Sequence, residues 1–278
     1  MHMVSAEDVM SIASEAGRIA GLAIRPEQGA MIESRLAGLA RAEGYDSVNA
    51  LISALQTRRD IKLTGAAVEA LAGRDTWFFR LREQYELILS ELLPVLARAR
   101  GRTRPIRIWS AGCSTGQEAY SMAMNLAEET GLIGDLQVEI IGTDISRRAV
   151  ERARAGAFSQ FDVQRGLSIH RLVKHFEQSG KDWRLKTPIR SAVRFEADNL
   201  LNPSDTIGQF DIIFCRHVLS TLTPDARKRV IGNLAARCAP DGYLLLGEGE
   251  AAYAAGPFRA VRGQKGILAR ETVTEMAA

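Results

Sequence analysis

The chain has 278 residues, of which 46% are hydrophobic and 25% are charged, the composition of an ordinary folded protein. The formal net charge is +3, which is too small to indicate nucleic-acid binding. No apolar run reaches the roughly 18 residues that cross a bilayer, and the first ten residues lack a basic-then-apolar leader. We therefore expect a cytoplasmic protein of one large or two modest domains, without membrane insertion or nucleic acid as a partner.

The cysteines and histidines show no metal-binding pattern. Cys113, Cys215 and Cys238 are widely spaced in apolar surroundings, as is typical of reduced interior thiols rather than of a disulfide framework. None of the four histidines lies at metal-binding spacing from them. No metal site is expected.

The first part of the chain is predicted to be helical. Ser5, with Asp8 three residues later, is a typical helix start. In "GAMIESRLAGLARAEG" the apolar residues recur at helical spacing, and Gly44 ends the run. "SVNALISAL" indicates a third short helix. We expect a small helical domain over 1–72 that contains no strand.

From about residue 105 short apolar runs alternate with helical stretches. This alternation is the signature of a parallel sheet covered by helices on both faces. We therefore expect an α/β fold, with a domain over 73–278. The predicted strands lie in "IRIWSA", "QVEIIGTD", "VRFEAD", "FDIIFCRHVL" and "GYLLLGEGE".

Two further segments carry structural expectations. The interval 158–193 breaks the alternation and is predicted to be an inserted, small antiparallel appendage. Asp241-Gly242 marks a turn from the last helix into the last strand.

Five arginines cluster just before the first strand of the sheet. Two interpretations stay open: a solvated connector, or a docking surface for an acidic partner. The cluster consists of Arg98, Arg100, Arg102, Arg104 and Arg107.

The turn "SAGCSTG" follows the first predicted strand, and ligands of open parallel sheets bind at the carboxyl ends of strands. Gly112 and Gly116 let the backbone approach a ligand closely. The next strand ends in Asp144, an acid suited to ribose hydroxyls. The third ends in Asp198-Asn199, which could read an adenine edge. Together these strand ends would surround a nucleoside.

The turn matches neither the dinucleotide fingerprint G-x-G-x-x-G nor the phosphate loop G-x-x-x-x-G-K-[ST], which argues against NAD and ATP. Glu118, just past the turn, suits a positively charged ligand better than a phosphate. S-adenosyl-L-methionine has a ribose, an adenine, an amino-acid end and a sulfonium, and it has no phosphate.

Five segments carry a resemblance to the CheR-type chemotaxis receptor methyltransferases. They are "ESRLAGLAR", "RDTWFFR", "WSAGCSTGQEAYSMAM", "FDIIFCRHVL" and "PDGYLLLGEGE", in this order along nearly the whole chain. The resemblance implies an enzyme that uses S-adenosyl-L-methionine to methylate glutamate side chains on receptor cytoplasmic helices, releasing S-adenosyl-L-homocysteine. It also implies a small N-terminal helical domain, a Rossmann-like methyltransferase domain and an inserted antiparallel β-subdomain.

The resemblance also assigns cofactor contacts, position by position. Glu118 would take the amino-acid end and Asp144 the ribose. Asn199 and Leu200 would lie along the adenine. The full set implied is Thr76, Arg80, Ala111, Gly112, Glu118, Asp144, Asn199, Leu200, Arg216 and His217.

A carboxylate that attacks a sulfonium methyl is already charged and needs no general base, so the enzyme has to align the reactants and exclude water. Arg80 suits the steering of the carboxylate, because a guanidinium can hold one oxygen while the other attacks. Thr221 stands where the family usually has a tyrosine beside the methyl group. We expect Arg80 and Thr221 to be the catalytic residues.

The chain departs from the family pattern at four positions. Arg74 and His217 replace asparagines, Gln117 replaces a glutamate, and Thr221 replaces the tyrosine. Three alternatives therefore stay open. They are an active enzyme with altered substrate preference, a cofactor-binding adaptor without turnover, and a methyltransferase for another carboxylate or a small molecule.

The resemblance extends to partners. In the family the helical domain contacts receptor helices, and this chain offers Arg35 and Arg41 for that contact. The appendage contains only Gly180 within "HFEQSGKDWRLK", which resembles the family form that does not tether a receptor pentapeptide. We expect a monomer that acts on a chemoreceptor or related signalling protein without a tight pentapeptide tether.

Overall fold

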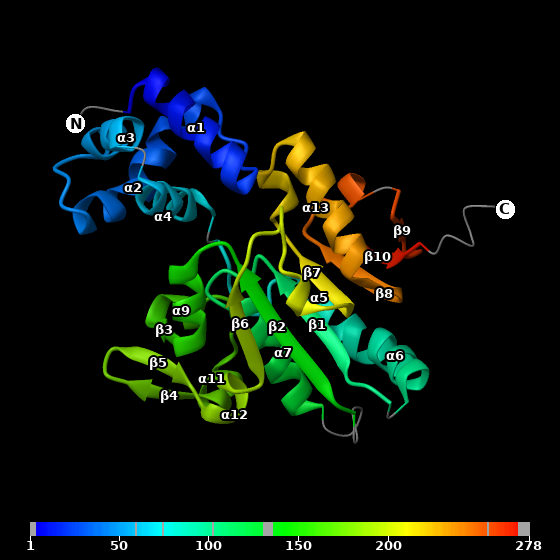
Figure 1. Cartoon of the computed structure of the whole chain (residues 1–278). Coiled ribbons are helices and arrows are strands. Elements are labelled where there is room, and N and C mark those ends of the chain that lie inside the picture. Colours follow the sequence, from blue (N-terminus) through cyan, green and yellow to red (C-terminus); the bar gives the residue numbers. More distant parts are fainter. Residues whose placement is uncertain are drawn as a thin grey trace. The chain divides into compact units, whose positions relative to one another are not determined.

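The computed structural model describes residues 4–58, 60–73, 75–101, 103–129, 136–254 and 256–271. These residues form two compact units. The first holds the chain up to Gly73 together with Leu219–Val230, and the second holds the remainder. Figure 1 shows a helical first part of the chain and a later part built around a sheet.

The first unit is helical, as predicted. Ser5 caps its first helix, since its Oγ accepts the Asp8 N–H at 3.1 Å. Asp60 caps the fourth in the same way. The helices of this unit are α1 (Ala6–Ala20), α2 (Gly29–Ala42), α3 (Val48–Arg58) and α4 (Ile61–Leu71), with short turns η1 (Pro26–Gln28) and η4 (Leu219–Thr221).

A later segment of the chain joins this unit through backbone hydrogen bonds. The Ala23 N–H donates to the Thr221 carbonyl at 2.8 Å, and the Thr223 N–H donates to the Gly21 carbonyl at 2.8 Å. Leu22 and Leu222 form an isolated antiparallel bridge. The segment that contains Thr221 is therefore held against the loop after α1.

The second unit contains a seven-stranded sheet in the order β6-β2-β1-β7-β8-β10-β9. The first five of these strands are parallel, and β10 pairs antiparallel with β8 and β9. This confirms the predicted α/β fold. The strands are β1 (Ile106–Ala111), β2 (Val138–Asp144), β6 (Val193–Ala197), β7 (Phe210–Cys215), β8 (Cys238–Leu246), β9 (Phe258–Ala260) and β10 (Ile267–Arg270).

Helices cover this sheet, and Trp109 stacks on Phe210 within its core at 5.2 Å between ring centroids. Among the helices, α7 and α9 both pack against β2 and β6, and α6 and α7 both pack against β1. The helical elements of the unit outside the appendage are α5 (Arg82–Leu87), η2 (Ile88–Leu92), α6 (Leu93–Arg100), α7 (Gln117–Glu128), α9 (Arg147–Ala155), η3 (Asp205–Ile207) and η5 (Ala251–Ala254). Helix α13 (Pro224–Arg237) begins among the residues of the first unit and leads into β8 of the second.

The predicted antiparallel appendage is present between β2 and β6. Its sheet has the order β3-β5-β4, with every pair antiparallel. Phe78 anchors it, because its ring lies edge-on to Phe158 at 5.0 Å and to Phe176 at 5.6 Å. The elements are β3 (Ala157–Ser159), α10 (Gln160–Gln164), α11 (Ile169–His175), β4 (Phe176–Ser179), β5 (Asp182–Leu185) and α12 (Thr187–Arg190).

The turn predicted at Asp241-Gly242 is wrong. Strand β8 runs through both residues, with a register shift opposite Phe210 and Ile212. A Cβ at Gly242 would lie 2.8 Å from the Cys238 Sγ. The glycine therefore allows the strand to bulge instead of turning away from the sheet.

The arginine cluster surrounds a fully buried acid, Asp211. Arg100 and Arg104 donate to its carboxylate at 2.7–2.9 Å, and so does the Arg107 backbone N–H at 2.8 Å. Burial by itself would raise the pKa of Asp211, but the hydrogen bonds, led by those of Arg104, hold it below its ordinary value. Arg100 and Arg104 therefore neutralise a buried acid, whereas Arg98 is exposed, and a docking surface for an acidic partner stays a prediction. Arg102 lies outside the described residues.

Candidate active site

Most of the predicted cofactor residues lie at or just after the carboxyl ends of four neighbouring parallel strands, whereas Thr76 and Arg80 precede α5. The register places Ala111 beside Thr143, Asp144 beside Ala197, and Ser110 beside Phe214. Strands β1, β2, β6 and β7 therefore end along one edge of the sheet, where the chain order reverses between β1 and β7.

The turn after β1 requires its glycines. Gly112 has φ +79°, and a Cβ there would lie 2.6 Å from the Val218 Cγ2. Gly116 has φ +93°, and a Cβ there would lie 3.0 Å from the Phe195 ring. The Gly112 N–H also donates to the Thr143 carbonyl at 2.8 Å, which holds the turn against the end of β2. Larger residues would push the turn away from this edge.

Asp144, at the end of β2, joins two of the loops. Its carboxylate accepts the Ser114 N–H at 2.8 Å and the Ser146 N–H at 2.9 Å. Its carbonyl accepts the Asp198 N–H at 2.9 Å. Each carboxylate oxygen can accept more than one hydrogen bond, so this fixed acid is suited to hydroxyl groups of a ligand.

Asn199 and Leu200 follow the end of β6, and both are half-buried. The Asn199 Oδ1 accepts the Leu201 N–H at 3.0 Å, which fixes the orientation of the carboxamide. The Leu200 carbonyl accepts from Asn233 of α13 at 2.9 Å. This loop is therefore held firmly between β6 and the C-terminal half of α13.

Glu118 and Arg216 form a buried ion pair at the centre of the site. The Arg216 Nε donates to the Glu118 Oε2 at 2.5 Å, and the two side chains are 2% and 12% exposed. Ser110 Oγ donates to the other carboxylate oxygen at 2.6 Å. Burial by itself would lower the pKa of Arg216, but Tyr85 and Glu118 raise it overall, so the guanidinium stays charged.

Arg216 also binds the segment that carries Arg80. Its Nη1 donates to the Arg80 carbonyl at 2.6 Å and to the Gln84 Oε1 at 3.3 Å, and its Nη2 donates to the Tyr85 hydroxyl at 2.9 Å. Burial raises the pKa of Tyr85 to about 12, so the phenol stays neutral. One guanidinium thus ties β7, α7 and the segment before α5 together.

Arg80 itself lies between two residues with left-handed backbone, Phe79 at φ +54° and Leu81 at φ +56°. Its Nη1 donates to the Asp75 carbonyl at 3.0 Å, and its Cζ lies 4.0 Å from the Trp77 ring centroid. Such backbone costs about 1–3 kcal/mol per residue and persists where the surroundings impose it. The other non-glycine residues with positive φ among those described are Ser114 and His217, also at this site.

His217 is held through its backbone by Glu250. The buried Glu250 Oε2 accepts the His217 N–H at 2.6 Å and the Gly247 N–H at 3.0 Å. Burial, reinforced by repulsion from Arg80, lowers the pKa of His217, so its ring is neutral at pH 7. Sequence reasoning missed Glu250, although "GEGE" was part of the motif that carried the resemblance.

Two unpartnered polar atoms test whether these residues fit S-adenosyl-L-methionine. Within the described part of the second unit, Ser114 Oγ and His217 Nε2 are the buried side-chain atoms without a hydrogen-bond partner. They lie in the loops after β1 and β7. Buried polar atoms normally have partners, so these point to a polar ligand. Two acids, Glu118 and Asp144, also suit a cationic ligand with hydroxyl groups, so the residues fit the cofactor.

The remaining predicted residues are placed as follows. Ala111 is buried at the end of β1, and Thr76 is half-buried at the start of the segment that contains Arg80. Thr221 belongs to the helical unit, where it lines a hollow of about 300 Å³ with Arg25 and Arg35. Its placement beside Arg80 stays a prediction. Arg74 lies outside the described residues.

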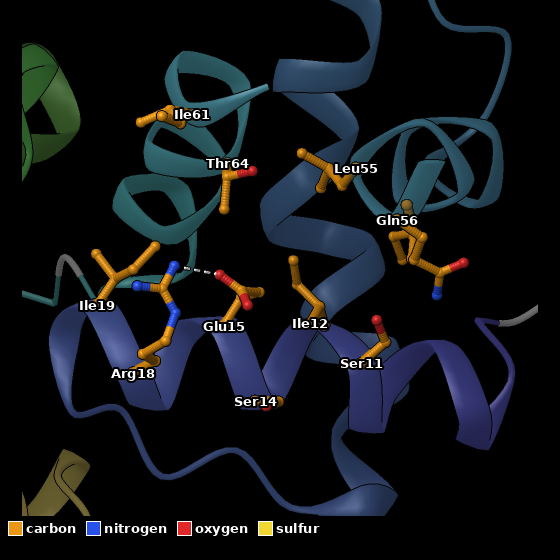
Figure 2. A pocket seen from close by; sticks show the side chains of 11 residues that line it. Ser11, Ile12, Ser14, Glu15, Arg18, Ile19, Leu55, Gln56, Ile61 and Thr64 are labelled. Carbon is orange, nitrogen blue, oxygen red and sulfur yellow. Dashed lines mark hydrogen bonds and ion pairs between the residues drawn. The ribbon is translucent and has the colours of Figure 1, made fainter. Parts of the chain in front are cut away.

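A larger hollow of about 690 Å³ lies within the helical unit, between α1, α3 and α4. Figure 2 shows Ile12 and Ile19 of α1 and Leu55 of α3 around it, with the Glu15–Arg18 ion pair of 2.7 Å at its edge. It contains none of the predicted catalytic or cofactor residues. Among the described residues no three metal-ligating side chains cluster, and no helix is long and apolar enough to span a membrane.

Comparisons with known proteins point to one family. Residues 74–267 match the family model described as CheR methyltransferase, SAM binding domain. Chemotaxis protein methyltransferase 1 of Pseudomonas aeruginosa is 36% identical over 83% of this chain and 85% of that protein. The protein of the same name from Vibrio cholerae is 36% identical over 89% and 90%.

A solved structure gives a weaker likeness. Magnesium protoporphyrin IX methyltransferase from Synechocystis aligns over 87% of this chain and 96% of that one. The identity is 15% and the TM-score is 0.38, which is too low to support an argument.

Proposed function

The chain belongs to the CheR methyltransferase family, and on that premise we propose that it methylates glutamate side-chain carboxylates on the cytoplasmic helices of a chemoreceptor. The family resemblance predicted from the motifs is confirmed, as is S-adenosyl-L-methionine as the cofactor. The chain is therefore a methyltransferase of chemotaxis. The glutamate substrate, the residue roles and the cytoplasmic location form the proposal.

The cofactor supplies an electrophilic methyl group on a sulfonium. A glutamate side chain has a pKa of about 4.3 and is ionised at pH 7, so no residue of this chain has to remove a proton from it. Arg80 holds one carboxylate oxygen and leaves the other to react. The support for this role is that Arg216 and two residues with left-handed backbone fix the Arg80 backbone. The chain's own contribution is alignment and exclusion of water.

The proposed cofactor-binding residues lie along the edge of the sheet where the parallel strands end. Glu118 binds the ammonium group and Asp144 the ribose hydroxyls, and Asn199 with Leu200 lies along the adenine. The buried Glu118–Arg216 pair is the single observation that carries this proposal. A buried ion pair suits a ligand whose amino-acid end carries both charges, because that end adds no net charge to the buried region.

Substrate recognition involves the helical unit. Arg35 and Arg41 are exposed on α2, and receptor helices that carry several glutamates are acidic partners for them. The hairpin β4–β5 turns tightly at Gly180, with φ +61°, which supports the absence of a pentapeptide tether. Micromolar binding of a receptor C-terminal pentapeptide, measured by calorimetry, would contradict this.

The deciding experiment uses labelled methyl transfer. Purified chain and labelled S-adenosyl-L-methionine are incubated with a receptor cytoplasmic fragment, and the label is tested for release as methanol by alkali. Alkali-labile label shows a carboxyl methyl ester. If calorimetry shows cofactor binding but no methyl is transferred, the second candidate is favoured, an adaptor without turnover. His217 and Thr221, which replace the family asparagine and tyrosine, support this candidate. Label that alkali does not release favours a substrate other than a carboxylate.

A further inference from the structure

A second arginine lies beside Arg80. Arg165 follows α10, and its Cζ lies 4.6 Å from the Trp77 ring centroid, while that of Arg80 lies 4.0 Å from the same centroid. The two guanidinium carbons are therefore at most about 8.6 Å apart. Arg165 also lies 5.6 Å from the centroid of Phe161, a ring that is 65% exposed.

The fold holds this arrangement through Gly166. This residue has φ +81°, and a Cβ on it would lie 1.9 Å from the Phe78 carbonyl oxygen. No other residue type can occupy the position without moving one of the two segments. The loop after α10 is therefore packed directly on the segment that contains Trp77 and Arg80. The packing of these two backbone segments therefore fixes the position of Arg165 in the chain beside Trp77.

The two guanidinium groups are poorly neutralised. Arg165 pairs with Asp75 at 3.2 Å, but this acid is 70% exposed, so solvent screens the pair. Arg80 donates to the Asp75 backbone carbonyl, which carries no net charge. Glu118 already pairs with Arg216. Positive charge therefore exceeds negative charge around Trp77, and Arg165 keeps 38% of its side chain exposed.

We propose that Arg165 binds a second carboxylate of the substrate, on an acidic side chain one helical turn from the glutamate that Arg80 holds. This rests on the proposed function, since it assumes a helical substrate. Side chains three or four residues apart on a helix have Cβ atoms about 5–6 Å apart, which lies within the upper limit that the distances from Trp77 set for the two guanidinium carbons. Arginine suits this role because its planar fork binds carboxylates with two parallel hydrogen bonds. Arg165 thereby determines which glutamates are methylated.

The test compares two substrates. Both are receptor cytoplasmic fragments with one methylatable glutamate; one carries Glu four residues away, and the other carries Gln there. We expect the wild-type chain to favour the acid-flanked fragment about fivefold in kcat/KM, the ratio that one exposed ion pair can provide. Arg165→Gln should remove the preference and leave transfer to the amide-flanked fragment unchanged. Asp75→Asn should enlarge the preference, because a competing carboxylate is removed.

Arg148→Gln, on the exposed face of α9, is the matched control and should keep the full preference. A variant with Arg165→Gln that still discriminates as the wild type does would overturn the inference, as would a wild-type chain that methylates both fragments equally. Transfer to neither fragment by the wild type would instead refute the proposed function. Calorimetry with S-adenosyl-L-methionine on Arg165→Gln separates a folding defect from lost recognition, because cofactor binding should be unchanged.

Discussion

The buried pair of Glu118 and Arg216 allows a quantitative test of what holds the site together. Glu118→Gln keeps the shape of the side chain but leaves the Arg216 guanidinium, 2% exposed, without a countercharge. Breaking a buried pair on one side typically costs 3–5 kcal/mol. Because the glutamine oxygen still accepts a hydrogen bond, we expect a loss of about 3 kcal/mol in the free energy of unfolding.

Urea unfolding followed by tryptophan fluorescence measures this loss. The three tryptophans, Trp77, Trp109 and Trp183, all belong to the second unit, so the signal reports the part of the chain that contains the pair. With a slope of about 2 kcal/mol per molar urea, the midpoint should fall by about 1.5 M.

The double variant Glu118→Leu with Arg216→Met separates stability from binding. Replacing both charges by apolar groups removes the desolvation cost, so the double variant should be more stable than Glu118→Gln. Cofactor affinity, measured by calorimetry, should nevertheless remain lost. A midpoint shift below about 0.5 M for Glu118→Gln, or cofactor binding by the double variant, would refute the assignment of this pair as the buried centre of the cofactor site.

Three further predictions concern the loops around this pair. Gly112→Ala should lower cofactor affinity at least tenfold in calorimetry, because the new Cβ meets Val218, whereas Gly38→Ala in α2, with open space around it, should slightly raise the melting temperature. Glu250→Leu should weaken cofactor binding and Glu250→Gln should largely restore it, because the amide oxygen can still accept the His217 N–H; equal affinities would contradict the positioning role. Because the pKa of His217 is lowered in the folded chain, the neutral ring contributes stability that is complete above about pH 6.5 and is lost as the pH falls below it. The melting temperature of His217→Asn should therefore depend less on pH between 5 and 7 than that of the wild type.

Local patterns were sufficient for the helices of the first unit and for the parallel strands. Ser5 caps α1 as its spacing from Asp8 predicted, and the alternation of apolar runs and helical stretches identified the parallel strands. These signals are readable because caps and periodicity involve residues only a few positions apart. Where a local signal competed with long-range packing, it failed: Asp241-Gly242 reads as a turn, but pairing with β7 carries β8 through it.

The sequence by itself determined which loops lie together, because residues that follow parallel strands share one edge of the sheet whatever the side-chain details. It also brought Arg80, Glu118 and Asp144 forward as candidates. Only the tertiary structure decided what holds them. Arg216 reaches Glu118 across 98 positions of chain, and contacts over such separations leave no periodic trace in a single sequence. The same holds for the placement of Arg165 beside Arg80, which depends on Gly166 packing against a distant backbone carbonyl.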